Sequence, residues 1–119
     1  MGKMKITEGK NGKRIVEEPC EGPCPIERGM RIVGGKWTGS ILWHLKDKPV
    51  RFNDLSRQLS GASKKMISQR LKEMEENKLV IRKVVSDQPV AITYEASEFG
   101  KTALKFLDEL QLWVNENGL

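Results

Sequence analysis

The feature that most constrains the fold is a change of periodicity near residue 79. Upstream of this point, apolar residues recur every three or four positions, which is the spacing of helices that bury one face. Downstream come LVIRKVV and VAITYEA, two runs rich in β-branched residues and separated by the turn-forming residues SDQP. Such a pair predicts a two-stranded hairpin over residues 80–96. We therefore expect a mostly α chain with one small β element.

Capping residues and chain breaks divide the rest of the apolar pattern into five expected helices. Pro25 suits a first helical position, because its missing N–H has no helical partner there. Asn53, Ser63 and Ser97 are expected N-caps. Trp37 is expected in the buried face of the second helix. The expected helices cover about residues 25–33, 36–45, 53–60, 63–77 and 97–117.

Length and composition favour one domain preceded by a tail. The chain has 119 residues, of which 38% are hydrophobic and 31% charged, and this is enough apolar material for a single core. Residues 1–19 mix Gly, Lys, Glu and Asn without a period and are expected to be a flexible tail, whereas residues 20–119 should form the domain. No apolar run approaches the roughly 20 residues that cross a bilayer. Residues 1–13 offer no signal peptide, so we expect a cytoplasmic protein without membrane contact.

Positive charge is concentrated in the middle of the chain. Residues 36–83 hold twelve basic and five acidic side chains, whereas residues 84–119 hold two and six. A positive field on one part of a small domain indicates a polyanionic partner. Nucleic acid is favoured over an acidic membrane surface, because no lipid-inserting basic helix is apparent.

The expected helix 63–77 carries its basic and amide residues at its start and its acids at its end. Three helices followed by a hairpin is the element order of a winged helix-turn-helix, whose reading helix enters the major groove of double-stranded DNA by its N-terminal part. Lysines at a helix start oppose the helix dipole, which favours DNA contact over a merely solvated face. The candidate DNA contacts are Ser63, Lys64, Lys65, Ser68, Gln69, Arg70 and Lys72 in this helix, Arg51 before the preceding helix, and Arg82 and Lys83 on the hairpin, which would be the wing.

Four segments carry motifs that are specific in combination. They are CPIERGMRIVGGKWTGSIL, RFNDL, SKKMISQRLKEMEENKLVIR and PVAITYEASEFG. Over about residues 24–114 the chain resembles the HxlR-type transcriptional regulators, a winged-helix group within the wider MarR-like proteins. The resemblance implies a DNA-binding homodimer, and in several members the cysteine before the first helical proline, here Cys24, senses electrophiles or oxidants. Ala96 and Gly39 are smaller than the family pattern, so looser packing is expected around them.

The two cysteines are candidate sensing residues. Cys24 is expected at the N-cap of the first helix, where free amides and the helix dipole favour a thiolate; the alternative is a small half-buried residue. Cys20 lies four residues away in a segment with Gly and Pro and can serve as a resolving thiol, so a small-molecule or electrophile effector would act here. A zinc site needs more ligands, and the single histidine, His44, lies in another helix. We expect no metal and no cofactor.

The first and last expected helices are candidate dimerisation elements. The last helix carries more large apolar side chains than its share of a small core requires. In a two-fold dimer the two reading helices would lie about 34–36 Å apart, one turn of DNA, and would match a pseudo-palindromic operator. Modification of Cys24 would then shift the first helix and change this spacing. The candidate interface residues are Ile26 and Met30 in the first helix and Ala103, Phe106, Leu107, Leu110, Trp113 and Val114 in the last.

Two other functions stay open at this point. Cys20 and Cys24 could make the chain a thiol-disulfide exchange protein, although redox-active pairs are usually spaced more closely and follow a strand. A winged-helix module that binds only protein would tolerate replacement of Lys65 and Gln69. A lone His, no Ser-His-Asp set and no paired carboxylates in an apolar pocket predict that the chain is not an enzyme.

Overall fold

The structure is a computed structural model that describes residues 6–8, 14–16, 22 and 24–119. The chain divides into two units, residues 1–31 and 32–119. In the first unit, strands β1 (Ile6–Glu8) and β2 (Arg14–Val16) pair in antiparallel register. The other residues of 1–19 lie outside the described part, so the flexible tail stays a prediction. None of the described helices is long and apolar enough to cross a membrane.

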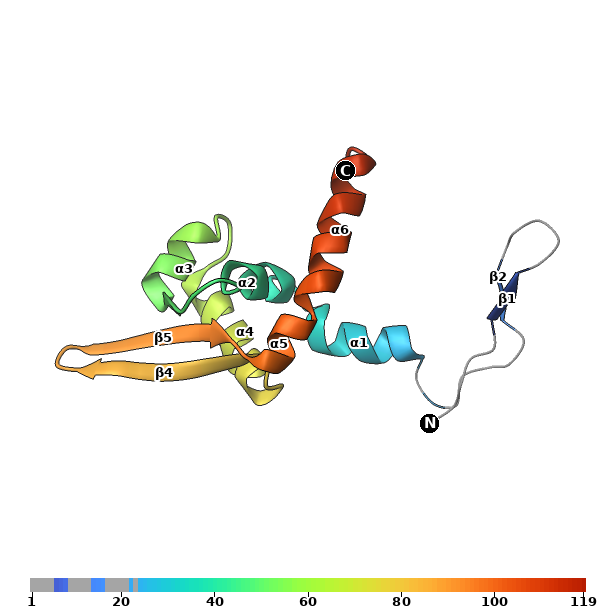
Figure 1. Ribbon diagram of the computed structural model, residues 1–119. Helices are drawn as coiled ribbons and strands as arrows, with labels where there is room; N and C mark the ends of the chain where they lie inside the picture. The colour runs from blue at the N-terminus through green and yellow to red at the C-terminus, as the bar shows by residue number, and fades with distance from the viewer. Residues whose placement is uncertain (1–5, 9–13, 17–21, 23) are drawn as a thin grey trace. The chain divides into compact units, whose positions relative to one another are not determined.

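Helix α1 (Pro25–Val33) begins at Pro25, as the sequence predicts. Along the chain it is followed by three helices, a hairpin and two further helices (Figure 1). This order confirms the predicted class, a mostly α winged helix-turn-helix with a small sheet. The elements are α2 (Thr38–His44), β3 (Val50–Arg51), α3 (Phe52–Gln58), α4 (Lys64–Glu76), β4 (Val80–Asp87), β5 (Val90–Ala96), α5 (Glu98–Thr102) and α6 (Leu104–Glu116).

Three strands form an antiparallel sheet in the order β3, β5, β4. β4 and β5 are the predicted hairpin, and they project from the helices as a two-stranded ribbon that we call the wing (Figure 1). β3 was not predicted; its Val50 pairs with Tyr94 and its Arg51 with Thr93. A strand of two residues is too short to show an alternating pattern in the sequence. It nevertheless joins the start of α3 to the sheet.

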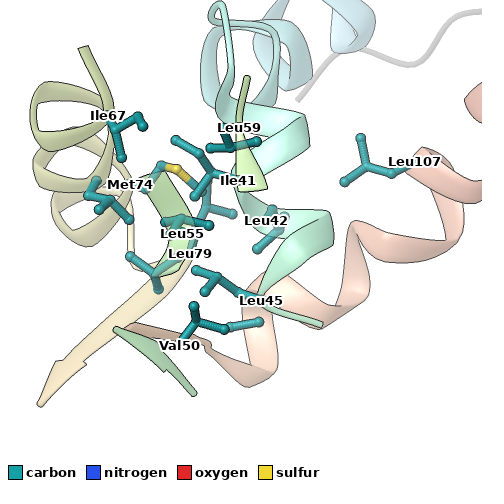
Figure 2. Packing of buried hydrophobic residues seen from close by; sticks show 13 residues of the cluster. Ile41, Leu42, Leu45, Val50, Leu55, Leu59, Ile67, Met74, Leu79 and Leu107 are labelled. Atoms are coloured by element: carbon teal, nitrogen blue, oxygen red, sulfur yellow. The ribbon is translucent and has the colours of Figure 1, made fainter. Parts of the chain in front are cut away.

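The core of residues 32–119 lies between α2, α3, α4 and the base of the sheet (Figure 2). Burial of one large aliphatic side chain contributes roughly 1.5–3 kcal/mol to the stability of the fold, so the buried cluster holds α4 firmly against its neighbours. The largest fully buried side chains are Ile41, Leu42, Leu45, Leu55, Ile67, Leu71, Met74 and Leu79.

The passage from the wing into α5 is a close-packed corner. Ser97 caps α5, as predicted, by accepting a hydrogen bond from the Gly100 amide at 2.9 Å. A Cβ at position 100 would lie 2.2 Å from the Leu79 carbonyl oxygen. Only glycine fits there, which gives the last residue of the segment PVAITYEASEFG a physical reason.

The single helix expected over 97–117 is two helices in the structure, α5 and α6, which meet at Ala103. The Thr102 hydroxyl donates to the Phe99 carbonyl at 2.6 Å. In an unbroken α-helix this carbonyl would accept from the Ala103 amide, which instead donates to Gly100 at 3.1 Å. Local side-chain bonds of this kind compete with helical ones. The break sends α6 off in a new direction (Figure 1).

Three smaller expectations are also corrected by the structure. Arg51 rather than Asn53 precedes α3, and its side chain makes no capping bond. Trp37 lies just before α2 instead of inside it, although its half-buried ring packs against the core. Gly39 does not loosen the packing, because a Cβ there would lie only 3.2 Å from Leu107 Cδ2. The missing side chain lets α6 approach α2 closely.

Candidate nucleic-acid interface

Helix α4 is fixed at its start and along its buried face. Ser63 Oγ accepts a hydrogen bond from the Met66 amide at 3.1 Å, which is the predicted N-cap. Ile67, Leu71 and Met74 are buried in the core, as their helical spacing predicts. The helix therefore has a fixed direction, and within the part of the chain that the structure describes its other side is exposed.

The exposed side of α4 is a continuous polar surface. Residues 64–72 include four basic side chains and no acidic one, whereas Glu73, Glu75 and Glu76 follow at the far end. Within the described residues, no ion pair involves a lysine of this helix, so these charges can meet a ligand. We call the exposed set the reading surface: Ser63, Lys64, Lys65, Ser68, Gln69 and Lys72.

Arg70 does not join the reading surface. Its side chain is only 21% exposed, and its Nη1 lies 2.8 Å from Glu73 Oε2. Its Nε donates to the carbonyl of Lys36 at 2.9 Å. The guanidinium is thus occupied inside the protein, which the sequence could not reveal because Lys36 is 34 residues away.

The two basic residues predicted on the wing differ in their surroundings. Lys83 Nζ lies 2.6 Å from Glu95 Oε1 across the hairpin, and this ion pair offsets its charge. Arg82 is exposed and enters no ion pair among the residues described. From residue 84 to residue 92 the wing has no Lys or Arg, and Val84 and Val90 are exposed there. Positive charge is therefore supplied by the base of the wing.

Arg51 lies in a second basic surface, which sequence reasoning found only in part. An open groove of about 510 Å³ beside α3 and β5 is lined by Arg51, Lys48 and Arg57 among others. Arg57 forms an ion pair with Asp54 one turn earlier in α3. Three of the ten residues from 48 to 57 are basic, so local charge density could have pointed to Lys48 and Arg57 as well.

The order of helices and hairpin agrees with the family that the sequence matches. The family model described as HxlR-like helix-turn-helix matches residues 32–118. The chain belongs to the HxlR-like helix-turn-helix family. The MalR protein of Fusobacterium mortiferum is 37% identical over 95 residues, which are 79% of this chain and 90% of that protein. The HTH-type transcriptional regulator YodB of Bacillus subtilis is 34% identical over 94 residues, 78% of this chain and 84% of YodB.

Solved structures of other regulators share the fold. The redox regulator HypR in its oxidised form aligns with a TM-score of 0.74 at 30% identity, covering 78% of this chain and 96% of that one. Reduced YodB aligns with a TM-score of 0.69 at 34% identity, covering 79% and 93%. The resemblance found in the sequence is confirmed. This HxlR-like chain is a transcriptional regulator of the helix-turn-helix class, which binds DNA.

In this HxlR-like chain, Cys24 lies directly before α1. Its carbonyl accepts the first helical hydrogen bond, from the Arg28 amide at 3.0 Å, as expected of an N-cap residue. Its thiol is free and half-buried. Cys20 lies outside the described residues, so its pairing with Cys24 stays a prediction. Within the described part, no group of three His, Cys, Asp or Glu side chains could hold a metal ion.

Helix α6 presents a row of large apolar side chains to solvent. Phe106, Leu110 and Trp113 are 47%, 44% and 55% exposed. Their spacing of four and three residues places them on one helix face, and we call them the apolar stripe. The structure thus brings together three of the predicted interface residues.

The other predicted interface residues have different surroundings. Leu107 is buried in the core of the same chain, where it meets Gly39 and appears in Figure 2 beside α2. Ala103 packs partly against that core. Ile26 and Met30 of α1 are exposed, and Val114 of α6 is half-buried; these are the remaining members of the predicted set.

Proposed function

We propose that this regulator acts as a homodimer that reads a pseudo-palindromic operator with α4. The observation that carries the proposal is the reading surface, a set of exposed polar and basic residues on a helix whose other side is buried. A helix held in this way can enter the major groove by its N-terminal part. Gln69 has the amide that pairs with adenine, and Lys65 and Lys72 suit phosphates or guanine.

Anchoring to the DNA backbone is proposed for the arginines that flank α4. Arg82 is exposed at the base of the wing, and Arg51 is exposed at the start of α3, the helix that crosses the backbone in helix-turn-helix complexes. Lys83 is the weaker candidate, because Glu95 already pairs with it. Each phosphate contact releases counterions, so affinity should fall steeply as salt rises.

Dimer formation is proposed through the apolar stripe of α6, with Ile26 and Met30 of α1 as further contacts. Contiguous exposed apolar side chains on a small protein mark an interaction surface. A second copy is the occupant that serves the proposed operator, because only a two-fold dimer presents two reading helices to two half-sites. Leu107 is left out of this interface, since its side chain is used in the core.

Control of DNA binding through Cys24 is the last part of the proposal. The thiol lies at the start of α1, so a bulky adduct there would disturb the first turn of that helix. The similar protein HypR, which is 30% identical to this chain, is named a redox regulator, and its structure has been solved in oxidised and reduced forms. An electrophile or oxidant is therefore the proposed class of effector.

The deciding experiment is fluorescence anisotropy of the reduced protein on duplex from upstream of its own gene, beside a scrambled duplex, across a salt series. Tight, salt-sensitive binding that prefers the upstream duplex is expected, with loss of that preference in Lys65→Ala and Gln69→Ala. Lys105→Ala is the matched control, since Lys105 is exposed on α6, which points away from α4 and the wing (Figure 1). If no duplex selected from the whole genome is preferred, the proposal fails.

A further inference from the structure

We infer that Arg70 is a positioning residue that ties the loop leaving α1 to the middle of the reading helix through the Lys36 carbonyl, and that it does not contact DNA. The inference rests on the proposed function of α4, but its first test requires no DNA. It assigns to Arg70 a role different from the one that its charge and its place in α4 predict.

The direction of the Arg70 side chain excludes it from the reading surface. Two residues along an α-helix are 200° apart, so Arg70 points away from both Ser68 and Lys72. Its Nε donates to the Lys36 carbonyl at 2.9 Å, and its Nη1 donates to Glu73 Oε2 at 2.8 Å. A guanidinium used on two of its edges, and only 21% exposed, has little left to offer a phosphate.

The carbonyl that Arg70 binds is presented by an unusual turn. The Thr38 amide donates to the Gly35 carbonyl at 3.0 Å, which closes the turn 35–38. Trp37, its third residue, has φ 72° and ψ −12°, close to the values of a type II turn, where glycine is normally required. Type II turns have their central peptide turned over relative to type I, and here the carbonyl of that peptide belongs to Lys36. The left-handed Trp37 thus aims this carbonyl.

The same loop also lies near the connection that leads into the reading helix. A Cβ at Gly61, in the connection from α3 to α4, would lie 3.7 Å from Cη2 of the Trp37 ring. Trp37 is strained as a left-handed residue with a large side chain, and its packing against the core holds it there. The loop therefore bonds to the reading helix at Arg70 and has its Trp37 ring near the connection that precedes the N-cap Ser63.

This geometry gives the loop a role in placing the reading surface. Residues 34–37 follow α1 directly in the chain, and the Lys36 carbonyl holds the central turn of α4 through Arg70. Loss of the Arg70 bond should loosen the turn and permit small shifts of α4 on the core that holds its buried face. Recognition of bases, which demands an accurate approach, should suffer more than attraction to phosphates.

The first test is hydrogen–deuterium exchange of the protein alone. Arg70→Gln and Arg70→Lys should each raise exchange several-fold in amides 36–42, because neither side chain can keep both of the bonds that the guanidinium makes. Lys72→Gln, a neighbour on the reading surface, is the matched control and should leave these amides unchanged. Exchange in both Arg70 variants equal to wild type would overturn the inference.

The second test is binding to the upstream and scrambled duplexes across a salt series. Both Arg70 variants should lose most of the preference for the upstream duplex while the slope of log K against log salt stays as in wild type. A slope reduced by about 0.9 in Arg70→Gln but kept in Arg70→Lys would show a phosphate contact and overturn the inference. Wild-type protein that prefers no duplex would refute the proposed function instead, and the exchange result would still decide the role of Arg70.

Discussion

Ser97 Oγ donates a hydrogen bond to the Lys78 carbonyl at 2.6 Å, and this bond fastens the start of α5 to the point where the chain leaves α4. Lys78 is a left-handed residue, with φ 62°, two residues before the start of β4. The same hydroxyl lies 3.0 Å from the Leu79 carbonyl and accepts from the Gly100 amide. One side chain thus joins the end of the reading helix, the root of the wing and the C-terminal helices.

Replacing Ser97 with alanine should destabilise the protein by about 1–3 kcal/mol, because a helix cap is lost and carbonyls lose a donor. The free energy of unfolding from urea denaturation measures this. Ser60→Ala is the control, since Ser60 is exposed in the turn after α3, and it should stay within about 0.5 kcal/mol of wild type. Equal stability of the two variants would contradict the assigned role of Ser97.

Glycines 100 and 29 should respond in opposite ways to alanine. The new Cβ at Gly100 would lie 2.2 Å from the backbone oxygen of Leu79, so α5 or β4 must move, at a cost of about 3 kcal/mol or more. Gly29 lies inside α1 with open space around it, and alanine there should stabilise by up to about 1 kcal/mol. Melting temperatures compare the two; a Gly100→Ala protein that melts like wild type would refute the close approach.

The sequence predicted most of the fold because each main element has a local signal. Pro25, Ser63 and Ser97 marked helix starts that the structure confirms. The β-branched runs fixed the wing. The features that the sequence did not predict are set by contacts distant in sequence or by competing local bonds. Strand β3 depends on its pairing with β5. The division between α5 and α6 depends on the hydrogen bond of the Thr102 hydroxyl.

Leu107 and Leu110 should separate folding from association. Leu107→Ala removes a buried core side chain and should lower the free energy of unfolding by about 2–5 kcal/mol. Leu110→Ala removes an exposed member of the apolar stripe, so the stability of the single chain should change little while self-association weakens. Urea denaturation measures the first effect, and light scattering after size exclusion over a dilution series measures the second. If Leu110→Ala keeps the wild-type oligomeric state at every dilution, the stripe is not the interface.

The candidate site was predictable in its outline but not in its pairing. Helical spacing placed Lys65, Gln69 and Lys72 on the exposed side of α4, where the structure has them. The same pattern could not distinguish Arg70, whose partner is the Lys36 backbone, or Lys83, whose partner Glu95 lies on the neighbouring strand. Partners that are brought close only by the fold leave no trace in local periodicity.

Arg82 and Lys83 should therefore contribute unequally to DNA binding. Arg82→Ala should reduce the slope of log K against log salt by about 0.9, the value for one phosphate contact. Lys83→Ala should reduce it less, because Glu95 already neutralises that ammonium at 2.6 Å. Anisotropy titrations at four or more salt concentrations give the slopes. In the Glu95→Gln background, Lys83→Ala should reduce this slope more than it does in wild type. Equal reductions in both backgrounds would show that the ion pair is not the reason for the small contribution of Lys83.

Alkylation of the reduced protein with N-ethylmaleimide should weaken operator binding through Cys24. A bulky adduct on the half-buried thiol of Cys24, the residue directly before α1, should disturb the first turn of that helix, where the Arg28 amide donates to the Cys24 carbonyl. Cys24→Ser should bind DNA like wild type and lose the response, whereas Cys20→Ser should keep the response to an alkylating agent, which requires no resolving thiol. Diamide separates the two cysteines further, because disulfide formation within one chain needs both. An alkylated Cys24 protein, verified by mass, that retains full affinity would refute thiol control while leaving the DNA-reading role of α4 untouched.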